Sequence, residues 1–366
     1  MEMPVILEQS EIICGLGALA ETVTDLIDGA SAIAPGPWFD VPVAVVPFPD
    51  ARFRELDACA HRLLSAVDLS DVRPERTALI YCAAKGDISA VEQPAKACST
   101  PAASPDLWAQ AKAVEKTAGK QFGRTIAVST ACASGALGVE IAHELLTDGE
   151  IDHALLFGFD PLSRFVVSGF FALGALSRAG ARPFDAARDG LTPGDGAAIA
   201  LLSRRTAYAG DIVIAGAGSS NDANHRTGPS RDGSGLHAAA RAALRNARMT
   251  PKEVGAVKCH GTGTLYNDAM EAKALTLLLD DRYPPCASFK GALGHTSGGG
   301  ALLEIIIGAE CLRRHTLPPT AGFEAAGIDE PLPICAHSRP IKQPAMLCLS
   351  AGFGGVNAAV VLREFA

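Results

Sequence analysis

Apolar residues recur along the chain in two alternating patterns. Short continuous apolar runs predict buried strands, whereas apolar residues at every third or fourth position predict helices. The runs that predict strands are 11–14, 77–82, 125–128, 153–159, 197–202, 212–217, 254–259, 286–288, 346–349 and 357–362. The segments that predict helices are 19–27, 51–67, 107–118, 137–146, 235–247, 268–279 and 298–312, with a loop and helix at 165–176. Strands that alternate with helices predict an α/β fold.

The order of the elements starts again near residue 206, which predicts two similar halves, residues 1–205 and 206–366. No repeat is visible in the sequence itself, so this duplication rests on the order of the elements alone. The segment 35–50 is rich in proline and predicts an extended stretch at the surface.

Composition narrows the function classes. The chain has 366 residues, of which 48% are hydrophobic and 20% charged, as in a globular protein with a large core. A net charge of −8 argues against nucleic acid and anionic membranes as partners. Because no apolar run reaches eighteen residues and the N-terminus lacks a signal-type pattern, we expect no membrane span and a cytoplasmic location.

The ten cysteines are scattered, without a C-x-x-C pair or metal-ligand spacing. We therefore expect no metal site and no disulfide framework, with most cysteines reduced in the core. The glycine clusters lack the strand–GxGxxG–helix context of a nicotinamide site. The sequence thus predicts no bound cofactor.

Candidate chemistry begins at Cys132. It lies in a turn of small residues, 129–135, between a predicted strand and a predicted helix. Free N–H groups and the helix dipole at such a position favour a thiolate, which would make Cys132 a nucleophile. A lone cysteine in a packed turn is more often a structural core residue. The rest of the chain has to decide between these interpretations.

Three further features stand at the ends of predicted strands: His260, His295 and the turn 352–355. Ligands of α/β proteins bind beyond the carboxyl ends of strands. A cysteine with a histidine indicates covalent acyl transfer, and a second histidine could bind a developing enolate. Each histidine alone could also be structural.

These residues stand in five motifs that resemble, in order, those of the elongating β-ketoacyl-acyl-carrier-protein synthases, condensing enzymes of the thiolase superfamily. The motifs are Thr130-Ala131-Cys132-Ala133-Ser134-Gly135; Arg182-Pro183-Phe184-Asp185 with 188–190 and 194–197; His260-Gly261-Thr262-Gly263-Thr264 with Asp268 and Glu271; Lys290 to His295 with Glu304; and Gly352-Phe353-Gly354-Gly355-Val356-Asn357.

The resemblance implies a thiolase-like fold with a layered αβαβα core, in which residues 1–205 carry the nucleophile and 206–366 the two histidines. It also implies a role for each site residue. Cys132 would hold the acyl group, and the backbone N–H groups of Cys132 and Phe353 would form the oxyanion hole, with the Phe353 ring as a gate. His260 and His295 would promote decarboxylation of a malonyl thioester. The remaining implied residues are Lys290 and Glu304, which would order the histidines, and Thr262, Thr264 and Thr227, which would bind phosphopantetheine.

The implied partners are an acyl carrier protein and a second subunit, in a homodimer or in a heterodimer with a related ketosynthase-like chain. The pathway could be fatty-acid, polyketide or aryl-polyene synthesis. Two alternatives are a non-catalytic subunit that resembles chain-length factors and a coenzyme A thiolase of the same fold. The region before Arg124 is shorter than is usual in the family, and Ala351 replaces a common Phe.

Overall fold

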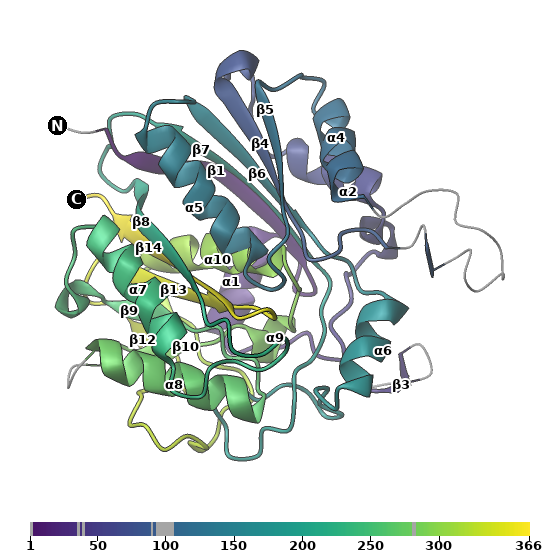
Figure 1. Ribbon diagram of the computed structural model, residues 1–366, viewed down its shortest axis with the longest axis vertical. Coiled ribbons are helices and arrows are strands. Elements are labelled where there is room, and N and C mark those ends of the chain that lie inside the picture. Colours follow the sequence, from purple (N-terminus) through teal and green to yellow (C-terminus); the bar gives the residue numbers. More distant parts are fainter. Residues whose placement is uncertain (1–2, 35–36, 39–40, 89–90, 93–105, 280–282) are drawn as a thin grey trace.

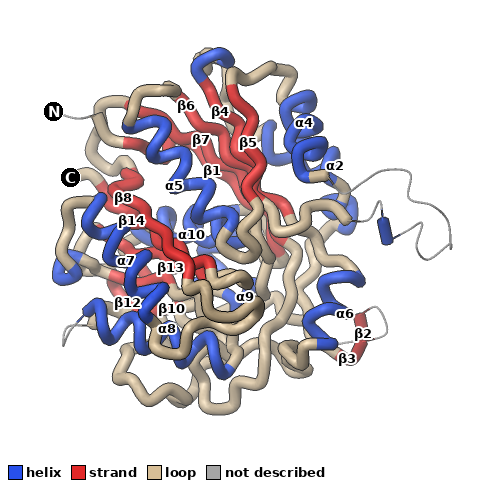
Figure 2. Tube along the Cα trace, in the orientation of Figure 1, coloured by secondary structure: helices blue, strands red, loops and turns tan. Residues whose placement is uncertain are grey.

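Ten strands of the described residues form one mixed sheet with helices on both faces (Figures 1 and 2). The computed structural model describes residues 3–34, 37–38, 41–88, 91–92, 106–279 and 283–366. The order of the strands across the sheet is β10-β9-β13-β14-β8-β1-β7-β6-β4-β5. The α/β prediction is therefore confirmed.

The sheet consists of two groups of strands with the same topology. The first group comprises β1 (Val5–Cys14), β4 (Thr77–Cys82), β5 (Arg124–Val128), β6 (His153–Phe159) and β7 (Gly196–Arg204). The second comprises β8 (Ile212–Asn221), β9 (Ala256–Lys258), β10 (Cys286–Ala287), β13 (Ala345–Ala351) and β14 (Val356–Glu364).

The strands pair in the same way in both groups. The fifth strand lies between the first and the fourth and pairs antiparallel with each of them. The second strand lies between the fourth and the third and pairs parallel with each of them. A short antiparallel contact of β1 with β8, through Val5 and Ile6, joins the groups. The topology is thus repeated although no repeat is visible in the sequence.

The helices lie in three layers, one between the two groups of strands and one on the outer face of each group. They are α1 (Leu19–Ile27), α2 (Leu56–Leu64), α4 (Leu107–Thr117), α5 (Ser134–Thr147), α6 (Arg164–Ala172), α7 (Ser234–Asn246), α8 (Leu265–Leu279), α9 (Lys290–Leu293) and α10 (Gly300–Arg313). Short 3-10 helices span Ala51–Arg54, Pro74–Arg76 and Pro251–Glu253. Two further pairs of strands are β2 (Pro37–Trp38) with β3 (Val41–Pro42) and β11 (Thr316–Leu317) with β12 (Arg339–Pro340).

Three hydrophobic clusters show how the layers stack. The central cluster contains side chains of α5 and α10 together with one face of each strand group. A second cluster packs α2 and α4 on the outer face of the first group, and a third packs α7 and α8 on that of the second. In β4, for example, Ile80 faces the centre and Leu79 the outside. Because both faces are covered, these strands are continuously apolar, and the layers are helix, strand, helix, strand, helix.

Three sequence predictions were wrong in detail. Residues 43–46 are buried rather than at the surface, since the chain runs beneath another loop and Val46 N–H donates to the Pro193 carbonyl. The strand 124–128 is partly exposed because β5 is the edge of the sheet. The helix expected at 51–67 is interrupted at Glu55, whose backbone is extended.

The close approach of α7 to β8 gives a test of this packing. A Cβ atom added to Gly216 would lie 2.4 Å from the Ala247 nitrogen, a backbone atom that cannot rotate away. We expect Gly216→Ala to destabilise the protein by about 1–3 kcal/mol in thermal or urea unfolding. Gly169→Ala in α6 is the matched control, because nothing lies within 4 Å of the added atom. Equal stability of the two variants would contradict the packing.

Candidate active site

Cys132 lies in a strained turn between β5 and α5. The preceding residue, Ala131, has a φ of +49°, which residues with a side chain rarely adopt. Ser134 holds the turn, since its hydroxyl accepts a hydrogen bond from Thr130 N–H (2.9 Å) and donates one to the Ala131 carbonyl (2.7 Å). The prediction that Cys132 stands between a strand end and a helix start is confirmed.

A cavity of about 990 Å³ opens at this turn, and Cys132 is part of its wall. Residues from distant parts of the sequence line the same cavity. Those that the sequence analysis singled out are Cys132, Thr227, His260, Thr262, Thr264, His295 and Phe353. The structure therefore brings seven of the nine predicted site residues to one space.

The two histidines form a perpendicular pair, with ring centroids 5.5 Å apart and an interplanar angle of 84°. They are 4% and 6% exposed, and the Nδ1 atom of each has no hydrogen-bond partner among the described residues. Burial and the nearby Lys290 ammonium lower the pKa of His260 well below its usual value and that of His295 to about 3. Both rings are consequently neutral at pH 7, and each offers one N–H donor.

Two buried carboxylates fix the backbone around His260. Glu271 accepts hydrogen bonds from the N–H groups of His260 (2.6 Å) and Gly261 (2.7 Å). Asp268 accepts them from Thr262 (3.0 Å) and Phe184 (2.7 Å). The acidic residues of the third motif are thus the acceptors that its loop requires, and Asp268 also joins this loop to the second motif.

Lys290 and Glu304 lie behind the histidines and do not line the cavity. Lys290 Nζ is 2.6 Å from Glu304 Oε1. The other carboxylate oxygen, Oε2, is 2.6 Å from Nζ of Lys258, a residue that the sequence analysis missed. A signal was present, because Lys258 is a charged residue within an apolar strand and only two positions before His260.

The thiol of Cys132 does not behave as the helix-dipole argument predicted. Burial raises its pKa to about 11, and Asp160 adds to the rise. The Lys290 ammonium and hydrogen bonds from the backbone N–H groups of Phe353 and Cys132 itself lower the pKa but do not offset burial. The prediction of a resting thiolate is therefore wrong, since desolvation of the sulfur outweighs the dipole.

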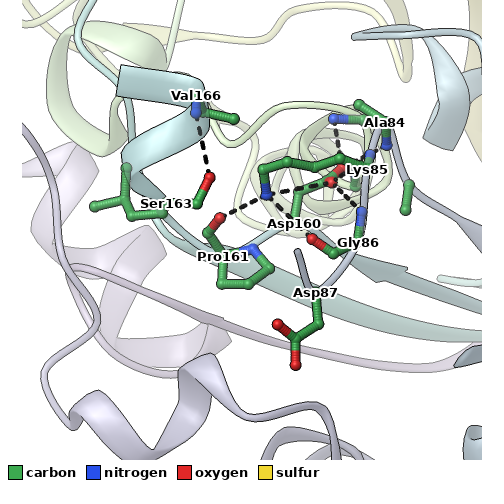
Figure 3. Close-up of polar contacts among 12 residues, drawn as sticks. Ala84, Lys85, Gly86, Asp87, Asp160, Pro161, Ser163 and Val166 are labelled. Carbon is green, nitrogen blue, oxygen red and sulfur yellow. Dashed lines mark hydrogen bonds and ion pairs between the residues drawn. The ribbon is translucent and has the colours of Figure 1, made fainter. Parts of the chain in front are cut away.

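Asp160, also missed by the sequence analysis, connects two loops of the site, and Figure 3 shows it beside Ala84, Lys85 and Gly86. Its carboxylate accepts hydrogen bonds from the N–H groups of Ala84, Lys85 and Gly86, at 2.7, 3.0 and 2.8 Å. It also accepts them from residues 298 and 299 at 2.8 and 3.0 Å, just before α10. The Lys85 ammonium lies 3.8 Å from Asp160 Oδ1 and donates to the Pro161 carbonyl. Asp160 thereby holds the end of β4 against the segment that follows His295.

Two family models match most of this region. "Beta-ketoacyl synthase, N-terminal domain" matches residues 120–207, and "Beta-ketoacyl synthase, C-terminal domain" matches residues 212–324. The chain belongs to the β-ketoacyl synthase family. The nucleophile turn and Asp160 lie in the first match, and both histidines with Glu304 lie in the second.

Relatives in the β-ketoacyl synthase family include 3-oxoacyl-[acyl-carrier-protein] synthase 2 of Rhizobium meliloti, 32% identical over 264 residues. The match spans 67% of this chain and 62% of that relative. The tetracenomycin polyketide synthase ketoacyl synthase alpha subunit of Streptomyces glaucescens is 33% identical over 263 residues, 66% of this chain and 60% of the relative. The chain thus matches less than two thirds of the length of these relatives.

Solved structures show the same fold. The ketosynthase ApeO in complex with its chain length factor ApeC, from Xenorhabdus doucetiae, gives a TM-score of 0.84 at 26% identity and covers 99% of this chain and 98% of that one. A β-ketoacyl synthase from Burkholderia phymatum gives 0.88 at 24% identity, with full coverage of both chains. The thiolase-like layered fold that the sequence motifs implied is confirmed.

Membrane spans and metal clusters are both absent from the described part of this β-ketoacyl synthase. None of its helices is long and apolar enough to cross a membrane. Within the same residues, no group of three or more His, Cys, Asp or Glu side chains is placed to hold a metal ion.

The raised pKa of Cys132 predicts how it reacts with iodoacetamide. Thiolate is the reactive form, so the rate should rise with pH throughout pH 7–10 and level off only near the pKa of about 11. Cys132 should still react faster than the other described cysteines, all of which are fully buried. Peptide mass spectrometry over time measures the labelling rate of each cysteine at each pH. A rate for Cys132 that levels off below pH 9 would contradict the raised pKa of its thiol. Cys98 lies outside the described residues.

Asp160→Asn tests the connection between the loops. An amide oxygen replaces only one of the two acceptor oxygens, and the amide N–H₂ group would face backbone donors. We expect a loss of about 3 kcal/mol or more in unfolding free energy, as for several buried hydrogen bonds left unmade. Asp148→Asn, at the exposed C-terminal end of α5, is the control and should change stability little.

Proposed function

We propose that this chain is a β-ketoacyl-acyl-carrier-protein synthase that catalyses decarboxylative Claisen condensation. One observation carries the proposal: Cys132, the neutral His260 and His295, and the Phe353 turn face a single cavity. The names of the relatives support the same reaction class. The cavity and the relatives support the activity together, and acylation of Cys132 is the event that tests it.

In the first half-reaction, Cys132 Sγ attacks the carbonyl carbon of an acyl thioester carried by an acyl carrier protein. The carbon–sulfur bond to the carrier breaks, and the proton of the Cys132 thiol leaves with the carrier thiol. The backbone N–H groups of Cys132 and Phe353, which already donate toward the sulfur, would bind the carbonyl oxygen as it becomes negative. One such donor contributes about 2.7–4 kcal/mol of transition-state stabilisation.

In the second half-reaction, a malonyl thioester loses carbon dioxide, and the electron pair of the broken bond forms an enolate. The neutral rings of His260 and His295 would donate N–H hydrogen bonds to the enolate oxygen. The enolate carbon then attacks the acyl-Cys132 carbonyl, forms the new carbon–carbon bond and displaces Sγ as a thiolate, which takes up a proton from water. Neutral rings can fill this role because an uncharged imidazole still has one N–H donor, and that hydrogen bond strengthens as negative charge develops in a buried site.

The rest of the cavity fits a carrier arm and an acyl chain. Thr262 and Thr264 have hydroxyls 2.9 Å apart on the cavity wall, and we assign them, with Thr227 at the exposed rim, to the phosphopantetheine arm. The Phe353 ring is 38% exposed and packs edge-on against Phe170 at 5.8 Å, as a movable gate would. Ala351 also lines the cavity, where a Phe would fill space.

The partners belong to the proposal as well. The acyl donor and the malonyl donor are acyl carrier proteins, which supply the phosphopantetheine, so the chain itself needs no cofactor. The Xenorhabdus doucetiae ketosynthase was solved in complex with its chain length factor, which supports a heterodimer as one arrangement. A homodimer, the cytoplasmic location, and fatty-acid, polyketide or aryl-polyene synthesis as the pathway stay predictions.

Intact-protein mass spectrometry tests the function directly. The protein is incubated with a panel of acyl carrier thioesters and then with malonyl carrier. We expect an acyl mass on Cys132 that disappears on addition of malonyl carrier, with carbon dioxide and an elongated product. Acylation on a partner subunit, and never on Cys132, would instead favour the non-catalytic chain-length-factor-like alternative.

Two variants separate the half-reactions. Cys132→Ala should abolish acyl transfer, whereas His295→Ala should still become acylated but lose condensation by about 10²-fold or more, because an enolate donor is missing. Loss of acylation in the histidine variant, with an unchanged melting temperature, would contradict the division of roles.

A further inference from the structure

Lys258 is the last residue of β9, and its side chain is completely buried. Its ammonium makes two short contacts, one with Glu304 Oε2 at 2.6 Å and one with the Leu349 carbonyl oxygen at 2.7 Å. Two residues further along the chain stands His260. Lys258 therefore lies beneath the site and does not line the cavity.

The contacts of Lys258 join the elements that carry the site. Glu304 belongs to α10 and binds Lys290 through its other oxygen, at 2.6 Å. Lys290 begins α9, which leads to His295. Leu349 lies in β13, which ends at Ala351, directly before the turn 352–355 that contains Phe353. A single ammonium thus connects the supports of both histidines and of the oxyanion turn.

The cluster of Lys258, Glu304 and Lys290 is not electrically balanced. Two ammonium groups share one carboxylate, although Lys290 alone would neutralise it. A buried uncompensated charge is costly, and an apolar side chain at position 258 would avoid that cost. Stability therefore gives no reason for the second lysine, whereas a reaction that creates negative charge nearby does.

Other groups face this cluster from the neighbouring elements. Glu271 of α8 interacts with both lysines, and burial raises the pKa of its carboxyl to about 7, so it is only partly charged at neutral pH. The Cys348 thiol of β13 faces Lys258, and burial raises its pKa to about 12. Lys258 also acts on His260 and His295, both of whose pKa values it lowers. The charged groups with the largest effect on Cys132 are Lys290 and Asp160.

We propose that Lys258 is a positioning residue whose ammonium locks Glu304 to β13 and leaves the cluster with one net positive charge. This charge favours negative charge at Cys132 and on the enolate, and it adds to burial, the larger cause, in disfavouring charged histidines. The effect of this charge on the enolate rests on the proposed condensing activity. The charge itself can be tested without that activity.

The test counts charge by substitution and reads it at Cys132. The cluster carries +1 in the natural protein, 0 in Lys258→Met, +2 in Glu304→Gln, and again +1 in the double variant. The readout is the rate at which iodoacetamide labels Cys132 at pH 8, followed by peptide mass spectrometry. Lys116→Met and Glu144→Gln, both on exposed helix faces, control for changes in overall charge.

Relative to the natural protein, we expect Lys258→Met to react more slowly and Glu304→Gln faster, with the double variant within about twofold. One unit of pKa changes the thiolate fraction tenfold, but nucleophilicity falls with pKa, so about threefold per unit is expected. A merely structural role predicts a different result. Both single variants break the contact between Lys258 and Glu304, so both would then change the labelling rate in the same direction. That result, or equal rates in all four proteins, would overturn the proposal.

Two further measurements complete the test. Melting temperatures show which variants fold. If Lys258→Met does not fold, the comparison of Glu304→Gln with the double variant still tests the proposal, because the labelling rate of Cys132 should fall back toward that of the natural protein. Where condensation is measurable, Lys258→Met should lower kcat for malonyl carrier more than it raises KM, and the double variant should recover part of kcat. A correct alkylation order with no condensation in any protein would refute the proposed function and leave the charge assignment standing.

Discussion

Buried carboxylates that accept hydrogen bonds from loop backbone hold the active site together. The loops after the strands carry N–H groups that no strand or helix satisfies, and each such group needs an acceptor once it is buried. Asp160 accepts from two loops of opposite halves, and Asp268 and Glu271 accept from the loop of His260. Asp195 does the same for Phe48 and for residue 162. The positions of the chemical groups depend on these acceptors.

Charge is used differently in the cluster beneath the histidines. Backbone donors stabilise a buried carboxylate but do not neutralise its formal charge, and the Asp160 carboxylate accordingly adds to the rise in the pKa of Cys132. Lys258 and Lys290 instead bring formal charge, and after burial, the largest cause, they further lower the pKa of His260 and His295. The same cation that disfavours an imidazolium favours an enolate or a thiolate. A site that must keep neutral donors ready for an anion gains in both respects from one buried ammonium.

Much of the site could be predicted from the sequence because its motifs are local. The turn of Cys132, the histidines and the acidic pair Asp268 and Glu271 are each set by a few neighbouring residues. Most strands and helices followed from apolar periodicity for the same reason, as 77–82 and 153–159 show.

What could not be predicted depends on long-range contacts. Asp160 is an ordinary acidic residue until residues 84–86 and 298–299 surround it, and Lys258 acquires a role only when α10 brings Glu304 to it. The thiolate prediction failed because a helix dipole can be inferred from sequence, whereas the depth at which the sulfur is buried cannot.

The repeated topology explains why the site draws on both halves. The strands β4, β5 and β6 of the first group correspond in order and direction to β9, β10 and β13 of the second. Cys132 follows β5 and His295 follows β10, so the nucleophile and one histidine occupy equivalent loops. His260 follows β9 and Phe353 follows β13, whereas the equivalent loops of the first half, after β4 and β6, contain residues 84–86 and Asp160.

The first half therefore uses two of its three strand-end loops to bind each other through Asp160, and this leaves only Cys132 to react. The second half has candidate chemical groups on all three loops. Asp268 and Glu271 hold the loop of His260, and Glu304, Lys290 and Lys258 support the histidines from below. An unbalanced buried charge accordingly lies beneath the histidines, whereas the loops beside the cysteine are held by Asp160 and its backbone donors.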